Sequence, residues 1–394
     1  MAEDPDSWEP ATRLIRGGLM RSNHGETSEA LYLTQSFAYE SAGAADRRFS
    51  GEDPGFVYSR YANPTTQMFE ERLALLEGAE YCRALASGMA AVHVALTGLL
   101  KAGDHLVAGR ALFGSCNWIV AQYLPRFGVE TTFVDATDLD AWKAAMRPNT
   151  KVVLLESPAN PLLEITDIEE VVKIAHAAGA KVVVDNVFAT PIFQKPLTMG
   201  ADVVVYSATK HIDGQGRVLG GAILGGEQVM LEAYKDILRH TGPALSPFNA
   251  WVLLKGLETL DLRVRRQSDN AAHVANAVAA HSKVRQTVYC GRPDHPQASI
   301  IANQMTGGGN VLAFDLGSRE AAWRFLDALQ IVDISNNLGD AKSMATHPCT
   351  TTHRSMPAEE REAIGLTEGW VRMSVGLESA VDLQRDVERA LDAA

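Results

Sequence analysis

The sequence has few cysteines, no long apolar run and no excess of positive charge. Its 394 residues contain four cysteines, Cys82, Cys116, Cys290 and Cys349, without a Cys-x-x-Cys pair, which predicts reduced thiols in a cytoplasmic protein. No apolar run approaches the roughly 20 residues of a membrane-spanning helix, and the acidic start MAEDPDSWEP is unlike a signal peptide. A net charge of −12 disfavours nucleic acid and anionic membranes, so an anionic ligand would need a local cationic site.

Hydrophobic periodicity predicts an α/β protein with an N-terminal arm and two domains. Residues 1–64 have weak periodicity and many small residues, which is typical of an extended arm. Residues 65–260 alternate short β-branched runs with helical patterns, as in a large domain with a mostly parallel sheet buried on both faces. Residues 261–394 mix strands and helices, which indicates a smaller C-terminal α+β domain beyond a long helical region near 247–281.

Individual elements can be placed from the same periodicity. Two helices are expected in PTTQMFEERLALLEGAE and SGMAAVHVALTGLL, and another through NWIVAQYLPRFG. The expected strands of the first sheet are HLVAG, ETTFVD, KVVLLES, KVVVD, DVVVYS and GGAILGG. In the second domain the expected strands include VLAFDL, IVDIS and WVRMSVG.

Polar segments follow three of the expected strands. They are ESPANP at 156–161, Asp185 in VVVDN, and Ser207 to Lys210 in YSATK. Ligands of open α/β sheets bind outside the carboxyl ends of the strands, so we expect these segments to converge there.

The glycines after Lys210 do not match the pattern of a nucleotide-binding loop. Gly214, Gly216 and Gly220 give the pattern G-x-G-x-x-x-G, which is one residue longer than the dinucleotide motif. The stretch also lies in mid-chain rather than in the first strand-to-helix turn. Nucleotide binding is therefore disfavoured.

Lys210 has the neighbours that pyridoxal phosphate chemistry requires. Ser207 and Thr209 can bind an anion, and SGM at 87–89 begins a helix whose free N–H groups suit a phosphate. Asp185 offers a carboxylate that keeps a pyridine nitrogen protonated, while the lysine amine bonds to the aldehyde of the cofactor. A single lysine would more often be a surface residue, but this combination predicts a pyridoxal 5'-phosphate site.

A second cluster, THPCTTTH, allows a test for metal binding. It contains His347, Cys349 and His353 within seven residues. A zinc site would need a fourth ligand and usually a second spaced pair. Polar or packing roles are therefore favoured, and no metal is expected.

Seven segments of the chain resemble those of one enzyme family and occur in its order: YSRYANPT, ASGMAA, ESPANP, VVVDN, SATKHIDGQGRVLGG, HPCTTTH and VRMSVGLE. From about residue 12 to the C-terminus the chain resembles the Cys/Met-metabolism pyridoxal-phosphate enzymes. These include cystathionine γ-synthases, methionine γ-lyases and homoserine-ester sulfhydrylases. SATKHIDGQGRVLGG and NNLGDAKS are most similar to the sulfhydrylases that act on O-succinylhomoserine. The resemblance implies a fold-type I transferase.

The resemblance also implies roles for individual residues. Lys210 would carry the cofactor covalently and move protons, and Asp185 would pair with the pyridine nitrogen. The phosphate would be bound by Ser207, Thr209 and the amides of Gly88 and Met89. Arg372 would hold the substrate α-carboxylate through two parallel hydrogen bonds, and Asn160 would contact the ring hydroxyl or that carboxylate.

Tyr58 and Arg60 in the arm would reach the phosphate of a neighbouring subunit, and Tyr58 would also approach the substrate. The resemblance thus implies a shared active site and a homotetramer built as a dimer of dimers.

Phe113, in LFGSC, departs from the family pattern, because many relatives have tyrosine at this place. Phenylalanine can stack on the cofactor ring but cannot transfer a proton. Ser115 stands where methionine γ-lyases have cysteine, and Cys116 follows it. These differences weaken a γ-lyase assignment and leave Lys210 as the chief proton carrier.

The implied reaction is γ-replacement in methionine biosynthesis, in which O-succinylhomoserine and sulfide give homocysteine and succinate. Cystathionine γ-synthase, O-acetylhomoserine sulfhydrylase and methionine γ-lyase remain alternatives, as do a hydrolytic or redox enzyme using Cys349 with His353 and a non-catalytic binding protein. Arg47, Arg48 and His347 could receive the succinyl carboxylate, although surface charge is an equally good interpretation.

Overall fold

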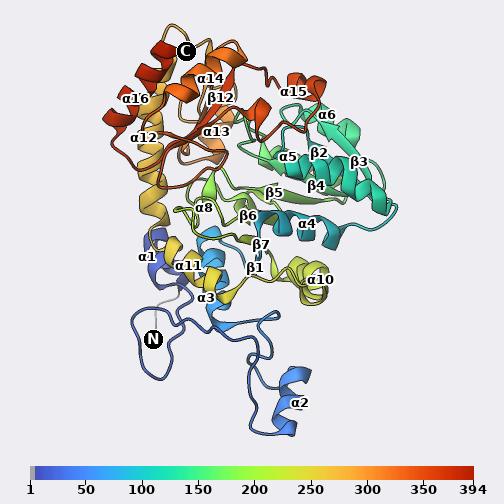
Figure 1. The fold of residues 1–394 in the computed structure, drawn as a ribbon. Helices are drawn as coiled ribbons and strands as arrows, with labels where there is room; N and C mark the ends of the chain where they lie inside the picture. The colour runs from blue at the N-terminus through green and yellow to red at the C-terminus, as the bar shows by residue number, and fades with distance from the viewer. Residues whose placement is uncertain (1–4) are drawn as a thin grey trace.

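A seven-stranded sheet forms the centre of the computed structural model, which describes residues 5–394 (Figure 1). Its strand order is β1-β7-β6-β5-β4-β2-β3, and all neighbours from β6 to β3 are parallel, whereas β7 is antiparallel to both β6 and β1. The predicted, mostly parallel sheet is therefore confirmed. The strands are β1 (Tyr81–Leu85), β2 (His105–Gly109), β3 (Glu130–Val134), β4 (Thr150–Glu156), β5 (Lys181–Asp185), β6 (Val203–Ser207) and β7 (Gly221–Gly225).

Strand β1 was missed by the sequence analysis. It lies between α3 (Pro64–Glu77) and α4 (Gly88–Leu99), and its five residues, YCRAL, contain a central arginine. Such a short run has no clear period of two. Its place is decided by backbone pairing with β7, which is distant in the sequence.

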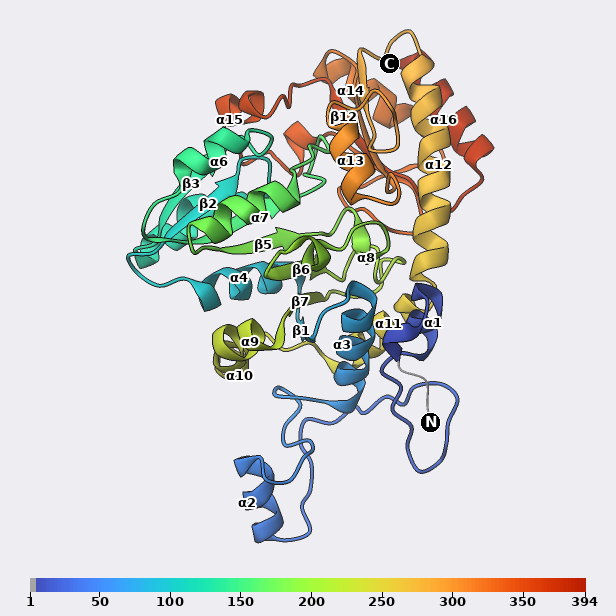
Figure 2. The same cartoon turned by 180° about the vertical axis from the view of Figure 1, so that it is seen from behind.

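Both faces of the sheet are buried, as predicted. Because side chains alternate along a strand, Val152 and Leu154 of β4 join the core beneath α4, whereas Val153 and Leu155 join the core that contains Ile168 of α7. Figure 2 shows α7 lying along the sheet. The remaining helices of this part are α5 (Gly114–Trp118), α6 (Leu139–Ala145), α7 (Ile168–Ala177), α8 (Thr190–Phe193), α9 (Glu227–Val229), α10 (Lys235–Thr241) and α11 (Pro247–Leu257).

The helix expected through NWIVAQYLPRFG is not continuous. The chain forms α5, then a π-helical segment η2 (Ile119–Tyr123), and then a 3-10 segment η3 (Leu124–Phe127). Pro125 has no N–H to donate and disfavours a regular α-helix around it. The other short helical segments are η1 (Pro5–Ser7), η4 (Pro196–Met199), η5 (Met230–Tyr234) and η6 (Pro348–Thr350).

A five-stranded sheet lies in the C-terminal part, with the order β10-β11-β12-β9-β8. Its strands are β8 (Gln286–Val288), β9 (Val311–Asp315), β10 (Asp333–Ile334), β11 (Met344–Thr346) and β12 (Trp370–Ser374). The expected strand IVDIS is reduced to two residues. The helices of this part are α12 (Leu260–Ala280), α13 (Ala298–Gln304), α14 (Arg319–Ala328), α15 (Ala358–Ala363) and α16 (Ala380–Ala393). Helix α12 runs beside the sheet from the top of the molecule towards α11 (Figure 1).

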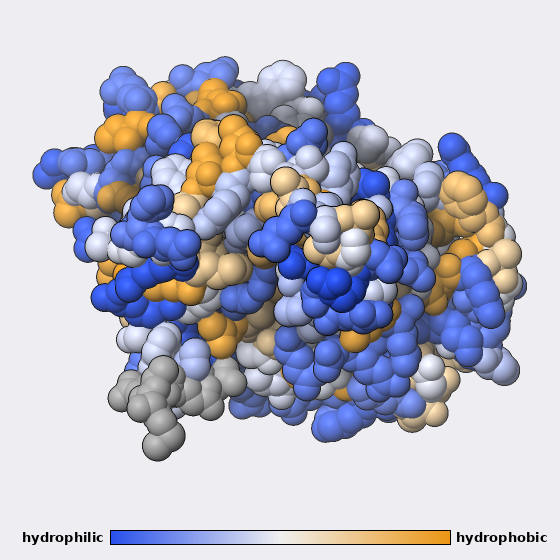
Figure 3. All heavy atoms as spheres, turned by 90° about the horizontal axis from the view of Figure 1, so that it is seen from below, coloured by the Kyte–Doolittle hydropathy of each residue, from blue (hydrophilic) through white to orange (hydrophobic). Residues whose placement is uncertain are grey.

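Most of the N-terminal arm extends away from the two sheets, whereas its first helix packs against α3, and the arm is more ordered than the sequence suggested (Figure 1). It contains α1 (Pro10–Arg16) and α2 (Ala42–Ser50), whose N-cap Ser41 accepts a hydrogen bond from the N–H of Ala44. Glu29 anchors it through Arg72 and Lys255, at 2.6 and 2.9 Å. Seen from below, the side from which the arm projects, the surface has apolar patches among hydrophilic ones (Figure 3).

Within residues 5–394, no helix combines the length and apolar character needed to cross a membrane. The four cysteines all belong to this described part, and each is buried with a free thiol.

Candidate active site

A cavity of about 250 Å³ lies at the carboxyl ends of β4, β5 and β6. The three strands are neighbours in the sheet, and Glu156 is in register with Asp185. The cavity brings together most of the predicted site residues: Gly88, Met89, Phe113, Asn160, Asp185, Ser207, Thr209, Lys210 and Arg372. The two sheets both contribute, because Arg372 comes from β12.

Lys210 follows β6 in a tight turn, in which its N–H donates to the carbonyl of Ser207. Its Nζ donates to Oδ1 of Asn337. Burial lowers the pKa of the Lys210 amine to about 8, and the positive charge of Arg372 adds to this effect. A substantial neutral fraction near physiological pH suits a nucleophile or a general base.

Asp185 ends β5 and lines the cavity. Its Oδ1 accepts a hydrogen bond from the N–H of Val187 at 3.1 Å. Burial raises the pKa of its carboxyl to about 6, since the charged form loses solvation. A protonated nitrogen heterocycle beside Asp185 would supply the missing compensation, so this carboxyl fits the pyridine nitrogen of pyridoxal phosphate.

An anion-binding cradle is formed by the start of α4 and the end of β6. Ser87 caps α4 by accepting from Ala90 N–H at 3.1 Å, and the first N–H groups of a helix have no acceptor within it. A Cβ atom on Gly88 would lie 2.5 Å from Cβ of Ser207, so only glycine permits this approach. Thr209 Oγ1 accepts from Gly220 N–H at 3.1 Å. The cradle fits a phosphate group.

Arg372 is a buried cation in the wall of the cavity. Its Nη1 donates to Asn160 Oδ1 at 2.9 Å and its Nη2 to the carbonyl of Asn336 at 2.8 Å. Its Nε is buried without a hydrogen-bond partner among the described residues. Burial lowers its pKa to about 10, which leaves the group charged at neutral pH. A carboxylate ligand would compensate this charge.

Asn337 was missed by the sequence analysis, although it contacts the amine of Lys210. It lies in the loop between β10 and β11, 127 residues away along the chain. NNLGDAKS served only as part of a resemblance, and no spacing links this segment to Lys210. Only the packing of the second sheet against the first brings the two side chains together.

Phe113 precedes α5 and forms another wall of the cavity. Cys116, one turn later, also lines it, and burial raises the pKa of this thiol well above its usual value. A thiol that stays protonated is a weak nucleophile. Cys116 is therefore disfavoured as a nucleophile. Phe113 offers the cavity a surface for ring stacking, and Ser115 is exposed on the outside of the protein.

The structure does not bring Tyr58 and Arg60 into this cavity. Among the described residues, the cavity lining includes neither of them. The Arg60 guanidinium lies 5.4 Å from the ring centre of Tyr58 and 4.8 Å from that of Tyr61, and it donates to the carbonyl of Arg239. These side chains lie at the base of the arm.

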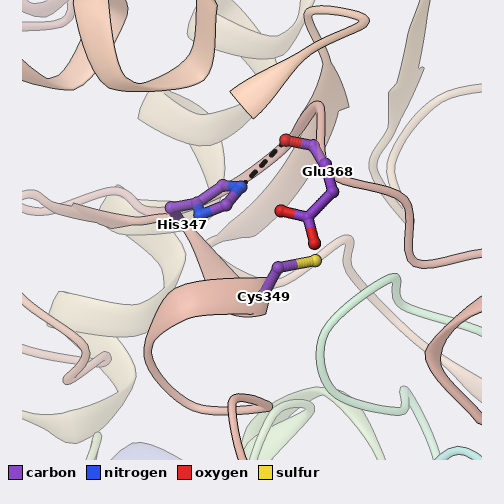
Figure 4. A group of neighbouring side chains, drawn as sticks. All are labelled: His347, Cys349 and Glu368. Carbon is purple, nitrogen blue, oxygen red and sulfur yellow. Dashed lines mark hydrogen bonds between the residues drawn. The ribbon is translucent and has the colours of Figure 1, made fainter. Parts of the chain in front are cut away.

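The THPCTTTH segment forms a different cluster from the one considered in the sequence. His353 is not part of it, and Glu368 takes the third place beside His347 and Cys349 (Figure 4). His347 Nδ1 contacts Thr350 Oγ1 at 2.8 Å, and its Nε2 donates to the carbonyl of Glu368 at 2.9 Å. The grouping considered from the sequence therefore differs from the one in the structure. His347 lies outside the cavity lining and both its ring nitrogens already have partners, which disfavours it as the residue that receives a succinyl carboxylate.

The remaining contacts of this cluster argue against a metal ion and against thiol chemistry. Arg319 and Arg361 pair with the Glu368 carboxylate at 2.9 and 3.3 Å, so positive charge is already in place there. Cys349 donates to the carbonyl of Thr367 at 3.3 Å, and burial raises the pKa of its thiol to about 11. The hydrogen bonds of the cluster connect the segment 347–350 with the segment 366–368.

Arg47 and Arg48 lie on α2 in the arm, outside the cavity. Arg47 pairs with Asp53 at 3.0 Å, and the Arg48 guanidinium packs against Gly55. Neither contacts the cavity of its own chain in the described structure.

Comparisons with known proteins identify similar chains over nearly the whole length. The model of the Cys/Met metabolism PLP-dependent enzymes matches residues 11–392. O-succinylhomoserine sulfhydrylase of Mycobacterium tuberculosis is 53% identical, covering 98% of this chain and 97% of that protein. The enzyme of the same name from Pseudomonas aeruginosa is 46% identical, covering 97% and 95%. An L-methionine gamma-lyase of Treponema denticola is 40% identical, covering 97% and 96%.

A solved structure has the same fold. It is a putative O-acetylhomoserine (thiol)-lyase from Campylobacter jejuni, with a TM-score of 0.95, 30% identity, and coverage of 98% of this chain and 100% of that one. That protein carries a pyridoxyl-lysine phosphate residue. Together with the two sheets described above, this similarity confirms the predicted fold-type I architecture with a smaller C-terminal sheet.

Proposed function

Because the chain belongs to the family of Cys/Met metabolism PLP-dependent enzymes, we propose that it replaces the succinyl group of O-succinylhomoserine by sulfide and produces homocysteine and succinate. The observation that carries this proposal is one cavity holding Lys210, Asp185 and Arg372, in a chain whose relatives at 53% and 46% identity are O-succinylhomoserine sulfhydrylases. The reaction exchanges a Cγ–O bond for a Cγ–S bond.

Pyridoxal phosphate is the cofactor of this family. When bound, it supplies a protonated ring that accepts electrons from the substrate carbons. The residues that would hold it are Lys210 through its amine, Asp185 at the ring nitrogen, and the cradle of Gly88, Met89, Ser207 and Thr209 at the phosphate.

Lys210 is the proton carrier of the proposed reaction. Its amine has a pKa lowered to about 8, so it can take a proton from Cα and return protons to the substrate carbons near neutral pH. Asn337 holds this amine through its side-chain oxygen. The hydrogen bond to Asn337 therefore fixes the position of the Lys210 amine from which proton transfer would begin.

Arg372 and Asn160 select amino-acid substrates. Arg372 binds the α-carboxylate, and Asn160 accepts a hydrogen bond from Nη1 at 2.9 Å and so orients the guanidinium plane. Because Lys210 lines the same cavity, its amine can approach Cα of a substrate held in this way.

Phe113 distinguishes this site from one that protonates a poor leaving group. It provides a ring wall and no proton, whereas succinate leaves as a stable carboxylate and needs little acid assistance. This supports an ester substrate over a thioether and places methionine γ-elimination below γ-replacement. The retained Lys210, Asp185 and Arg372 also argue against a non-catalytic binding protein.

A product assay tests the substrate assignment. O-succinylhomoserine and O-acetylhomoserine are each incubated with sulfide or cysteine, and the thiol and acid products are measured by mass spectrometry. We expect the succinyl ester with sulfide to give the highest kcat/KM, with homocysteine as the product. Faster formation of cystathionine from cysteine would instead identify a cystathionine γ-synthase, and faster use of the acetyl ester an O-acetylhomoserine sulfhydrylase.

Tyr58 and Arg60 are proposed to complete the active site of a neighbouring subunit, Arg60 at the phosphate and Tyr58 also near the substrate. They lie in the arm that projects from their own chain, and their own cavity lacks them. The proposed assembly is a homotetramer made of two such dimers.

Subunit mixing tests the shared site. Arg60→Ala and Lys210→Ala homo-oligomers should each be nearly inactive, because every site lacks one essential group. After mixing and subunit exchange, some sites combine intact residues from both chains, so activity should return to roughly a quarter of the wild-type value, the share expected from random pairing. Activity that stays at the level of the separate variants would show that Arg60 serves its own chain.

We propose a cytoplasmic location and three parts of the chain. Four buried free thiols suit the reducing cytoplasm. The arm at 1–64, the large domain at 65–260 and the small domain at 261–394 are proposed because the two sheets fall within the last two ranges.

A further inference from the structure

Glu156 is a buried carboxyl in the wall of the active-site cavity that none of the roles above uses. It is the last residue of β4, is 5% exposed, and is in register with Asp185 on the neighbouring strand. Burial and the nearby Asp185 raise the pKa of Glu156, whereas the N–H groups of Phe113 and Asn160 and the positive charge of Arg372 favour its charged form. Two carboxyl groups side by side in a buried site are costly, so the benefit of Glu156 must come from its contacts.

The two carboxyl oxygens of Glu156 bind two different walls of the cavity. Oε2 accepts a hydrogen bond from the N–H of Phe113 at 2.9 Å, and Oε1 accepts one from the N–H of Asn160 at 2.8 Å. Phe113 carries the aromatic wall at the start of α5. Asn160 orients Arg372 through its Oδ1 at 2.9 Å. One side chain therefore connects the ring wall with the substrate-carboxylate clamp.

Glu156 also counteracts the effect of burial on the positive charge of Arg372. Burial lowers the pKa of Arg372, whereas the negative charge of Glu156 acts in the opposite direction. Before a substrate arrives, Glu156 thus provides part of the compensation that the guanidinium needs, while the Nε of Arg372 remains without a hydrogen-bond partner in the described residues. The Glu156 carboxyl thus stabilises the charge of Arg372 while the Nε of Arg372 stays free to bind a substrate carboxylate.

We infer that Glu156 is a positioning residue that sets the aromatic wall at Phe113 and the clamp of Asn160 and Arg372 at the same time. The inference rests on the proposed function, because it assumes that Arg372 receives the α-carboxylate of an amino acid. It assigns Glu156 no contact with the reacting atoms. Its effect passes through the backbone of two loops that carry contacting residues.

The test compares Glu156→Gln with wild-type holoenzyme. Glutamine has nearly the same shape, but its amide nitrogen cannot accept, so one of the two backbone N–H groups loses its partner. Two ligands are titrated by the change in cofactor absorbance. L-norvaline has a methyl group in place of the homoserine hydroxyl and so cannot lose a leaving group, and butylamine is the same molecule without its carboxylate. The ratio of their dissociation constants measures the clamp alone.

We expect Glu156→Gln to reduce the preference for norvaline over butylamine by roughly tenfold, the usual effect of losing one charge-assisted hydrogen bond. The visible circular dichroism of the bound cofactor should change as well, because Phe113 shifts. The matched control is Glu164→Gln, since Glu164 is a partly buried carboxyl in the segment that follows β4, with a pKa raised by burial to about 7, outside the cavity lining. It should leave both measurements at wild-type values.

An unchanged ligand ratio or unchanged circular dichroism in Glu156→Gln would overturn the dual positioning role. Equal weakening of both ligands would also overturn it, because a general disturbance of the fold affects them alike. If the glutamine variant does not accumulate, Glu156→Asp replaces it, since the shorter side chain reaches only one of the two N–H groups. A wild-type enzyme that forms no homocysteine but keeps the norvaline preference would refute the proposed reaction and leave the role of Glu156 intact.

Discussion

Lys210→Ala is expected to abolish turnover and to remove the visible absorbance of the lysine-linked cofactor. The variant loses both the covalent attachment and the amine that moves protons at Cα. The rate should fall by roughly 10⁴-fold, the upper end of what removal of a general base costs. Absorbance spectra of the purified protein and single-turnover assays with the ester and sulfide measure the two effects separately.

The control for this variant is Lys195→Ala. Burial also lowers the pKa of Lys195, but this side chain lies outside the cavity lining, so both the spectrum and the rate should stay close to wild type. A Lys210→Ala protein that keeps more than roughly 1% of wild-type turnover would contradict the role of Lys210, since a general base contributes at least about 10²-fold.

Asp185→Asn is expected to lower kcat and kcat/KM together by roughly 10²–10³-fold, the usual loss when one preorganised charged group is removed from an active site. Asparagine occupies nearly the same space but cannot hold the ring nitrogen in its protonated form. Lys210 and the phosphate cradle remain, so the cofactor should still bind. Stopped-flow measurement of the chemical step and a count of bound cofactor per chain distinguish these effects.

Asp202→Asn is the matched control at the opposite end of the same sheet. Asp202 is a partly buried aspartate that pairs with Lys181 at 2.7 Å, and its hydrogen bonds to Lys181, Val182 and His176 lower its pKa. Asp185 has no such cation beside it, and burial raises its pKa. Its replacement should affect stability more than catalysis. Asp185→Asn kinetics as fast as those of Asp202→Asn would refute the assignment of Asp185 to the ring nitrogen.

The fold could be predicted wherever the signal was local. The strands from 105 to 207 are short, mostly apolar runs, several of them rich in valine, that alternate with helices, and such runs indicate burial on both faces. Strand β1 at 81–85 and the break near Pro125 were missed, because the first depends on pairing with a distant strand and the second on a change of helix type.

The residues of the candidate site also fall into those that local sequence could predict and those that it could not. Lys210 and Asp185 could be placed from the sequence because parallel strands deliver their carboxyl ends to one edge, whatever the loops do. Glu156 stood in a quoted segment, but no spacing indicated that its carboxyl would bind Phe113 and Asn160. Asn337 reaches Lys210 across 127 residues, and the group of His347 and Cys349 takes Glu368 instead of His353.

The sequence by itself determined the chemical groups of this protein and the sheet edge at which they would meet, because residue identity and strand periodicity are local properties. Only the tertiary structure decided how those groups are held. The partners of Lys210, Arg372 and Glu156 come from loops and from a second sheet, and their hydrogen bonds depend on how distant segments pack rather than on any pattern along the chain.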